Sequence, residues 1–446
     1  MEKNKLKQLI IEHKDRFLSS ENLVKRETQE IIKSYIKQKE IIIITGIRRS
    51  GKSSLMRLIS NDIIKEYDVP LDNILYLNFE DERFIDFSHN DFEPLYETFI
   101  ELYHPHGKKY IFLDEIQNIK GWEKWVNRLY EFEDIKIFIT GSNATLLSSE
   151  IATALTGRNR QLTCYPFSFR EFLTLRGYKF NQKDVYLREK KVRIKNLFKE
   201  YIELGGFPEV LKNKDNTLLE QYFKDIVYRD VIARYNIRNV KEIRELILFL
   251  SSNIGTTHSY KNLKELIDVK SLNTVKNYLE YLENVYLFFC IDLFDFSIKR
   301  QIYNPSKIYS IDSALSSSVA FRFSQDSGHI YENFVFVELL RRNKEIFYWK
   351  SKRGKEVDFL IKRGLKIEEA IQVSITLAEY KTKQREVDGL LDASRELNVK
   401  NLLIITEDEE GEEKIGKIKI RVIPLWKWLL EEHPNMECKL DSNLIS

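Results

Sequence analysis

The chain has 446 residues, of which 43% are hydrophobic and 12% aromatic. This length exceeds one ordinary core and predicts about two to four domains, and the apolar content excludes intrinsic disorder. The 71 Lys and Arg residues against 68 Asp and Glu give a net charge of +3. Overall charge therefore favours neither a nucleic acid nor a membrane surface as partner, and any such binding must be local.

Cysteine usage and hydropathy predict a cytoplasmic protein without a membrane partner. Three widely spaced cysteines, Cys164, Cys290 and Cys438, suit a reducing compartment better than a disulfide framework. The first residues are charged throughout and lack the apolar core of a signal peptide. The longest apolar run starts at Val285 and already contains Asp292, so it is too short to span a bilayer.

A phosphate-binding loop follows the first predicted strand, Ile41 to Ile44. The motif GIRRSGKS satisfies G-x-x-x-x-G-K-[ST], and apolar residues at helical spacing follow it. The glycines let backbone N–H groups point at phosphates, and the helix amino terminus adds its positive end. Lys52 would reach the terminal phosphates and Ser53 a magnesium ion. The predicted nucleotide-binding residues are Gly46, Ile47, Arg48, Arg49, Ser50, Gly51, Lys52, Ser53 and Ser54. For Arg48 and Arg49, contact with phosphate and contact with a neighbouring domain both stay open.

Further apolar strands are predicted from Asn73, over Tyr110 to Leu113, and from Ile135. The second of these ends in Asp114 and Glu115, and we expect it to neighbour the loop strand. Asp114 would hold Mg²⁺, and Glu115 would orient and deprotonate the attacking water. The third strand ends at a polar tip with Asn143, whose amide could contact the terminal phosphate or its water. Ordinary turn chemistry explains that tip equally well.

The sequence resembles the archaeal-type AAA-like P-loop ATPases, which usually carry a carboxy-terminal extension of unknown function. The segments that carry the resemblance are TGIRRSGKSSLM, LNFEDERF, FLDEIQNIKGWEKWVNRLY, TGSNATLL, LTGRNRQLTCYPFSFREFL and GGFPEV. The resemblance implies ATP as the nucleotide. It also implies Lys52 and Ser53 for ATP and magnesium, Asp114 and Glu115 as the acidic pair, and Asn143 as a sensor. Arg158 falls where such proteins place an arginine that acts on the nucleotide of the same or a neighbouring subunit, which leaves a homo-oligomer open.

Helical patterns dominate after Pro166, and the segment to about Lys214 is expected to form a helical lid over the nucleotide. Between Ile243 and Phe294 the pattern predicts a winged helix, whose third helix carries an apolar stripe from Leu272 to Val285. Its exposed face would present Asn273, Thr274, Lys276 and Asn277 to double-stranded DNA. Glu280 and Glu283 on the same helix would repel phosphate, and winged helices also act as spacers and protein-binding modules.

The last third is predicted as helix, three strands, helix and strand. This is the core order of the PD-(D/E)XK nuclease fold, and the extension of the resembled family is often nuclease-like. On that resemblance Glu332, Asp358 and Gln372 would form the site. Such chemistry needs magnesium ligands and a lysine, yet Gln372-Val373-Ser374 stands where Glu-x-Lys is expected. Lys350 or Lys355 could replace that lysine, or the fold could serve binding or assembly.

These patterns predict an α/β protein with four parts. Residues 1–165 would hold an amino-terminal helix and the P-loop core, 166–214 the lid, 215–310 linker helices and the winged helix, and 311–446 the nuclease-like domain. Two functions stay open. One is an ATPase coupled to DNA, through the winged helix and the basic turns at 350–355 and 362–366. The other is a nucleotide-dependent switch whose carboxy-terminal half binds a protein partner.

Overall fold

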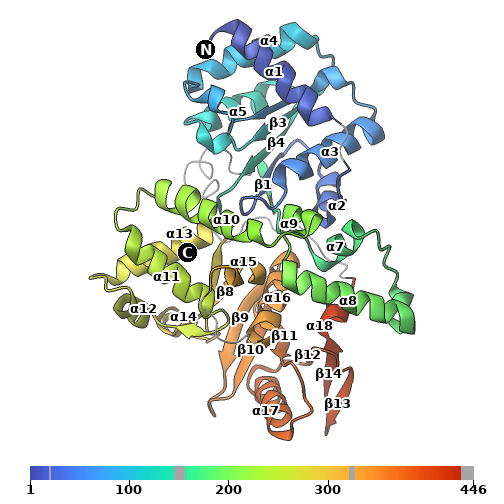
Figure 1. Cartoon of the computed structure of the whole chain (residues 1–446), viewed down its shortest axis with the longest axis vertical. Helices are drawn as coiled ribbons and strands as arrows, with labels where there is room; N and C mark the ends of the chain where they lie inside the picture. Colours follow the sequence, from blue (N-terminus) through green and yellow to red (C-terminus); the bar gives the residue numbers. More distant parts are fainter. Residues whose placement is uncertain (20–21, 145–154, 156, 321–326, 433–446) are drawn as a thin grey trace. The chain divides into compact units, whose positions relative to one another are not determined.

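The computed structural model describes residues 1–19, 22–144, 155, 157–320 and 327–432 (Figure 1). The chain divides into two compact units, which meet at Tyr165 and Pro166 in the sequence. Cys438 and the rest of 433–446 lie outside the described residues. Within the described part, no helix combines the length and the apolar character needed to cross a membrane.

A five-stranded parallel sheet forms the centre of the first unit, in the order β2-β3-β4-β1-β5. The expectation that the strand ending in Asp114 neighbours the loop strand is wrong. That strand, β3, is separated from β1 by β4, which pairs with both. The strands are β1 (Ile41–Thr45), β2 (Ile74–Asn78), β3 (Lys109–Asp114), β4 (Ile135–Gly141) and β5 (Asn159–Thr163).

Helices cover both faces of this sheet, which explains the continuous apolar runs in β1, β2 and β3. Ile41 and Ile43 of β1 pack in one cluster with residues of α1, α4 and α5, whereas Ile42 and Ile44 pack with residues of α2 and α3. The alternation follows from the two-residue period of a strand. The helices are α1 (Lys3–Leu18), α2 (Glu27–Lys33), α3 (Lys52–Tyr67), α4 (Phe92–Tyr103) and α5 (Trp122–Phe132), with short 3-10 turns η1 (Leu71–Asn73), η2 (Glu82–Phe84), η3 (His89–Asp91) and η4 (Ile116–Asn118).

The second unit begins with the helices expected to form a lid. Helix α8 packs against α15 and α18 of the same unit, so these helices are part of its core. At the turn after α8, a Cβ on Gly205 would lie 2.4 Å from Asp312 Oδ1, and the Gly206 amide donates to Asp312 Oδ2 at 2.7 Å. The elements are α7 (Phe169–Leu175), η6 (Gln182–Tyr186), α8 (Arg188–Leu204), α9 (Pro208–Asn213), α10 (Thr217–Asp225), the π-helix η7 (Ile226–Ala233) and α15 (Ser313–Ser317).

A three-stranded antiparallel sheet in the order β6-β8-β7 follows. Helix α11 precedes β6, helices α12 and α13 lie between β6 and β7, and α14 lies between β7 and β8. Helix α13 buries Val275, Leu279 and Leu282, but Leu272 is 44% exposed. The predicted apolar stripe therefore begins one turn later than expected, because Leu272 is the first residue of the helix. The elements are α11 (Val240–Ser252), β6 (Thr257–His258), α12 (Tyr260–Leu266), α13 (Leu272–Asn284), β7 (Phe288–Ile291), α14 (Ile298–Tyr303) and β8 (Ser306–Ser310).

A six-stranded mixed sheet completes the second unit, in the order β13-β14-β12-β11-β10-β9. Strands β9, β10 and β11 form an antiparallel meander, and β12 pairs in parallel with β11. Residues of helix α17 pack on this sheet in an apolar cluster that includes Val357, Leu390 and Ile404. The elements are α16 (Ser327–Arg341), β9 (Glu345–Lys350), β10 (Glu356–Arg363), β11 (Lys366–Val373), α17 (Tyr380–Leu397), β12 (Asn401–Thr406), β13 (Gly411–Ile415), β14 (Ile418–Pro424) and α18 (Leu425–Trp428).

Candidate functional site

The loop between β1 and α3 has a backbone that requires glycine. Gly46 has φ +143°, and a Cβ there would lie 2.3 Å from the Cys164 carbonyl oxygen. Gly51, immediately before α3, has φ +97°. Residues that carry a Cβ rarely adopt such angles. The loop is therefore held tightly against the end of β5, with its backbone curled ahead of the first turn of α3.

Lys52 lies inside this loop. Its side chain is 5% exposed, and Nζ is 3.1 Å from the Gly46 carbonyl oxygen and 3.3 Å from that of Ile47. The same ammonium is 3.4 Å from Glu115 Oε1. The loop lysine and the second acidic residue thus meet, although β4 lies between their strands.

Asp114 ends β3 and is fully buried. Its carboxylate accepts hydrogen bonds from Tyr76 Oη at 2.8 Å, from the Thr140 hydroxyl and from the Ser53 hydroxyl. Burial and the charge of Glu115 raise the pKa of Asp114 above its ordinary value. A nearby cation would strongly stabilise the ionised form of a carboxylate buried in this way.

Glu115 follows in the left-handed conformation, with φ +52°. Its amide donates to Thr140 Oγ1 at 3.0 Å, and its carboxylate accepts from Gln117 Nε2 at 2.5 Å. Burial alone would raise the pKa of Glu115, but the charge of Lys52 and the bond from Gln117 outweigh it and lower the pKa. Glu115 is therefore ionised at neutral pH.

These residues fit a phosphate chain and a magnesium ion. The Ser50 hydroxyl is buried and, within the described part of the chain, has no hydrogen-bond partner. An unpaired buried hydroxyl is costly, and a phosphate oxygen would satisfy it. Ser53 is exposed, and its hydroxyl donates a hydrogen bond to the Asp114 carboxylate. The hydroxyl and carboxylate oxygens therefore lie side by side, and both are of the kind that magnesium prefers as ligands.

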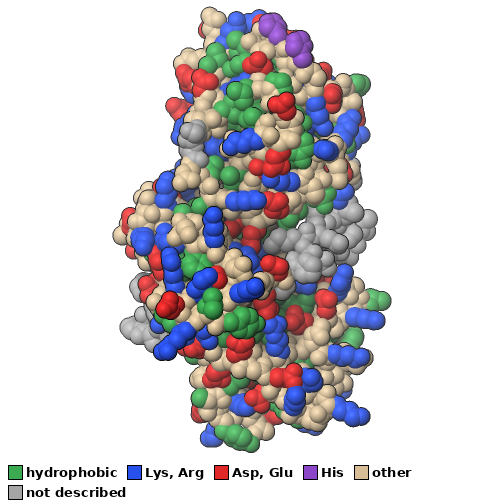
Figure 2. Space-filling view, turned by 90° about the vertical axis from the view of Figure 1, so that its right-hand side faces the viewer, with side chains coloured by type: hydrophobic (Ala, Val, Ile, Leu, Met, Phe, Trp, Pro, Cys, Tyr) green, Lys and Arg blue, Asp and Glu red, His purple; other side chains and the backbone are tan. Residues whose placement is uncertain are grey.

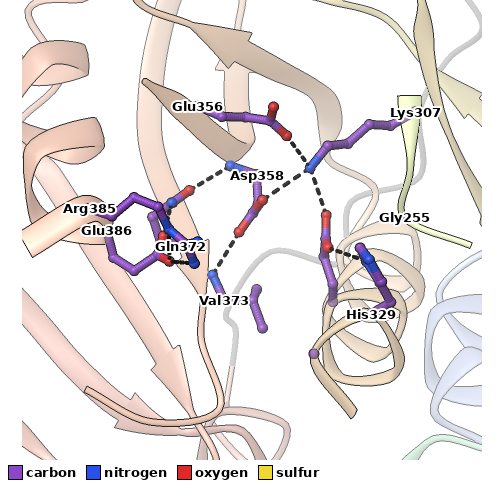
Figure 3. A pocket seen from close by; sticks show the side chains of 11 residues that line it. Gly255, Lys307, His329, Glu356, Asp358, Gln372, Val373, Arg385 and Glu386 are labelled. Atoms are coloured by element: carbon purple, nitrogen blue, oxygen red, sulfur yellow. Dashed lines mark hydrogen bonds and ion pairs between the residues drawn. The ribbon is translucent and has the colours of Figure 1, made fainter. Parts of the chain in front are cut away.

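The second unit brings together the three residues predicted for a nuclease-like site. Glu332, Asp358 and Gln372 line one cavity of about 410 Å³ (Figure 3). Gln372 Oε1 accepts from the Asp358 amide at 2.7 Å, and Asp358 Oδ2 accepts from the Val373 amide at 3.0 Å. Burial raises the pKa of Asp358 to about 7, with the Glu332 charge adding to the rise and Lys307 opposing it.

The lysine in this cavity is Lys307 of β8, which sequence reasoning missed. Lys307 contacts both Glu332 and Asp358, whereas Lys350 pairs with Glu356 Oε2 at 3.2 Å and Lys355 pairs with Asp388 at 3.5 Å. A single lysine in the short strand SKIYS, 51 residues before Asp358, carries no motif that marks it. Only the pairing of β8 within the fold reveals it.

Comparison with known proteins places the chain among relatives of the same length. The uncharacterized protein MJ1544 of Methanocaldococcus jannaschii is 38% identical over 411 residues, which cover 88% of each chain. The chain belongs to the MJ1544 family. An uncharacterized protein of Haemophilus influenzae is 32% identical over 422 residues, covering 93% of this chain and 99% of the relative.

Family models divide this member of the MJ1544 family into three segments. An AAA domain matches residues 38–173, and two domains of unknown function, DUF8612 and DUF4143, match 195–326 and 327–428. The first unit is thus an AAA-like P-loop ATPase domain, as its resemblance implied. The assignment rests on the family model together with the parallel sheet and the loop.

Two solved structures align with the chain at low scores. The Orc1 protein of Aeropyrum pernix in complex with DNA aligns with a TM-score of 0.31 at 13% identity, over 67% of this chain and 93% of that one. AMPPCP-bound DnaA from Aquifex aeolicus aligns with a TM-score of 0.27 at 14% identity, over 62% and 92%. At these scores neither likeness says anything about function.

Three other residues predicted for the nucleotide site lie in different parts of the AAA domain. Asn143 is buried just beyond β4, the strand beside β1. Arg48 pairs with Glu80 at 2.8 Å. Arg158 precedes β5 at the end of the sheet opposite the loop, and pairs with Glu131 of α5 at 2.6 Å. Action of Arg158 on the nucleotide of its own chain therefore has no geometric support, and action on a neighbouring subunit stays a prediction.

Proposed function

We propose that the AAA domain binds ATP with magnesium and hydrolyses it. The observation that carries the proposal is the meeting of Lys52, Glu115 and the Ser53–Asp114 pair at the carboxyl end of one parallel sheet. These groups arrive from separate segments of the chain. Together they provide a phosphate cradle, a lysine charge, oxygen ligands and a carboxylate base, which are the parts that phosphoryl transfer to water requires.

Each side chain has one proposed role. The loop backbone and Lys52 would hold the phosphates, and Ser53 with Asp114 would hold the metal. Bound magnesium neutralises charge that develops on the phosphate oxygens. Glu115 would orient the attacking water and accept its proton. Because Lys52 contacts Glu115, a phosphate that attracts the ammonium would raise the proton affinity of Glu115 as the substrate binds.

We further propose that turnover is coupled to DNA through residues 240–310. The order helix, strand, two helices and strand, followed by the short helix α14 and a last strand, with a sheet in the order β6-β8-β7, supports a winged helix in this segment. Asn273, Lys276 and Asn277 are exposed on α13, in the position of a recognition helix. Phosphate contacts from this face would position the duplex.

The second candidate is a nucleotide-dependent switch that recognises a protein. The observation that favours it is the pairing of the basic turns, because Lys350, Lys355 and Lys362 each contact a carboxylate. Figure 2 shows Lys and Arg side chains interspersed with Asp and Glu over the visible face. Such a surface suits a protein partner at least as well as a polyanion.

One ATPase assay separates these proposals. Wild type and Lys52→Ala are compared at low salt, with and without duplex DNA, and Lys65→Ala on the exposed surface of the same helix is the matched control. Loss of the lysine should lower turnover by roughly 100-fold or more, while Lys65→Ala keeps it. DNA that neither binds nor changes the rate would exclude the DNA-coupled function and leave the switch. Equal rates in wild type and Lys52→Ala would refute hydrolysis at this site.

A further inference from the structure

Lys307 occupies a place in the second unit where three carboxylates converge. Its Nζ is 2.9 Å from Glu332 Oε1, 3.0 Å from Asp358 Oδ1 and 2.7 Å from Glu356 Oε1 (Figure 3). The ammonium has three N–H groups, and each has a carboxylate oxygen within reach. The lysine side chain is only 4% exposed. A single positive charge is thus enclosed by oxygen atoms from two different elements, α16 and β10.

These oxygens include those that a nuclease-like site would give to magnesium. Mg²⁺ binds oxygen at about 2.1 Å and Ca²⁺ at about 2.3–2.6 Å, so a divalent ion among these carboxylates would compete for the place of Nζ. The other oxygens of the cluster are also engaged. Asp358 Oδ2 accepts from the Val373 amide, Glu356 Oε2 pairs with Lys350, and His329 lies 3.4 Å from Glu332 Oε2.

Three direct contacts with carboxylate oxygens, at 2.7–3.0 Å, hold the Lys307 ammonium in this place. Displacement by a metal would leave a buried ammonium without partners, which is strongly unfavourable. The residues of the cavity therefore do not fit the metal that its nuclease-like fold implies.

We propose that Lys307 is a built-in cation that replaces the metal ion of this cavity. The cavity is closed to divalent cations, and its charge cluster serves as a clamp. Lys307 belongs to the three-stranded sheet, whereas Glu332 and Asp358 belong to the helix and sheet that follow it. Their contacts join residues 240–310 to residues 327–432 through one buried cation.

The test is cation binding by full-length protein. Lys307→Met removes the charge and keeps an apolar side chain of similar length, which leaves three carboxylates facing one vacated position. This variant should bind Ca²⁺ or Tb³⁺ at least tenfold more tightly than wild type. Tb³⁺ luminescence excited through tyrosine reports the event, since Tyr309 Oη is 2.5 Å from Glu332 Oε1. The double variant Lys307→Met with Asp358→Asn should lose the gain.

Two results would overturn the proposal. One is a folded Lys307→Met protein that gains no cation affinity. The other is Mn²⁺ binding by wild type that disappears in Asp358→Asn, measured by electron paramagnetic resonance. The second measurement needs no change at Lys307, so it decides the question even if Lys307→Met does not fold. Equal Mn²⁺ binding by wild type and Asp358→Asn supports the built-in cation.

Discussion

At the residue scale, Gly46 determines the shape of the phosphate loop. Its φ is +143°, and a Cβ on this residue would lie 2.3 Å from the Cys164 carbonyl oxygen, so there is no space for any side chain. The motif predicted this glycine from sequence, since its position in G-x-x-x-x-G-K-[ST] is fixed. What it could not predict is the neighbour that forbids a Cβ, because Cys164 is more than a hundred residues away in the chain.

Gly46→Ala should therefore unfold or distort the first unit more than an alanine at another glycine with positive φ. Gly107 is the matched control, with φ +75° and nothing within 4 Å of its Cβ position. Gly107→Ala should cost about 1 kcal/mol, and Gly46→Ala roughly 3 kcal/mol or more with loss of nucleotide binding. Chemical denaturation and fluorescent-nucleotide titration measure both. Equal losses in the two variants would show that Cys164 does not confine the loop.

Lys307 marks the limit of sequence reasoning at this scale. The apolar strand before Asp114 and Glu115 pointed to that pair, whereas Glu332 and Asp358 were expected from the resemblance to a nuclease-like fold. Lys307 enters its cavity from a different sheet, 25 residues before Glu332 and 51 before Asp358. Its role depends on tertiary contacts, which no local period encodes.

At the scale of elements, Arg26 connects the start of α2 to two other segments of the first unit. Nη1 donates to the Ser50 carbonyl at 3.0 Å, and Nη2 donates to the Tyr165 carbonyl at 2.6 Å. Arg26 is buried, and its bonds support the loop from the side of β5. Strands β1 to β4 were predictable because an apolar run is local, whereas the polar β5 was not. The position of β4 between β1 and β3 was not, because pairing is decided by long-range contacts.

Arg26→Met should loosen the loop by removing the Arg26 hydrogen bonds to the Ser50 and Tyr165 carbonyls. Loss of buried hydrogen bonds of this kind costs about 1–3 kcal/mol, and the affinity for nucleotide should fall with the stability of the loop. Arg16→Met, at an exposed position of α1, is the control. Denaturation midpoints and nucleotide titration are the readouts. Unchanged nucleotide affinity in Arg26→Met would contradict a supporting role for this arginine.

At the scale of the whole molecule, the chain joins an AAA-like ATPase domain to a second unit with two further sheets. The sequence predicted the ATPase domain because its motif and flanking strands are specific. In the second unit it predicted the run of elements from α16 to β12 but not β13 and β14. The chemistry expected there depends on Lys307, Glu356 and the ion pairs of the basic turns. Under the proposal made for Lys307, these ion pairs act as a clamp in place of a metal site.

The central claim, hydrolysis of ATP at the first unit, is tested most directly with Glu115→Gln. The amide keeps the size of the side chain but cannot accept a proton from water. We predict that this variant binds ATP as tightly as wild type or more tightly, while single-turnover release of phosphate falls by about 100-fold or more. Wild-type rates of phosphate release in Glu115→Gln would contradict the claim.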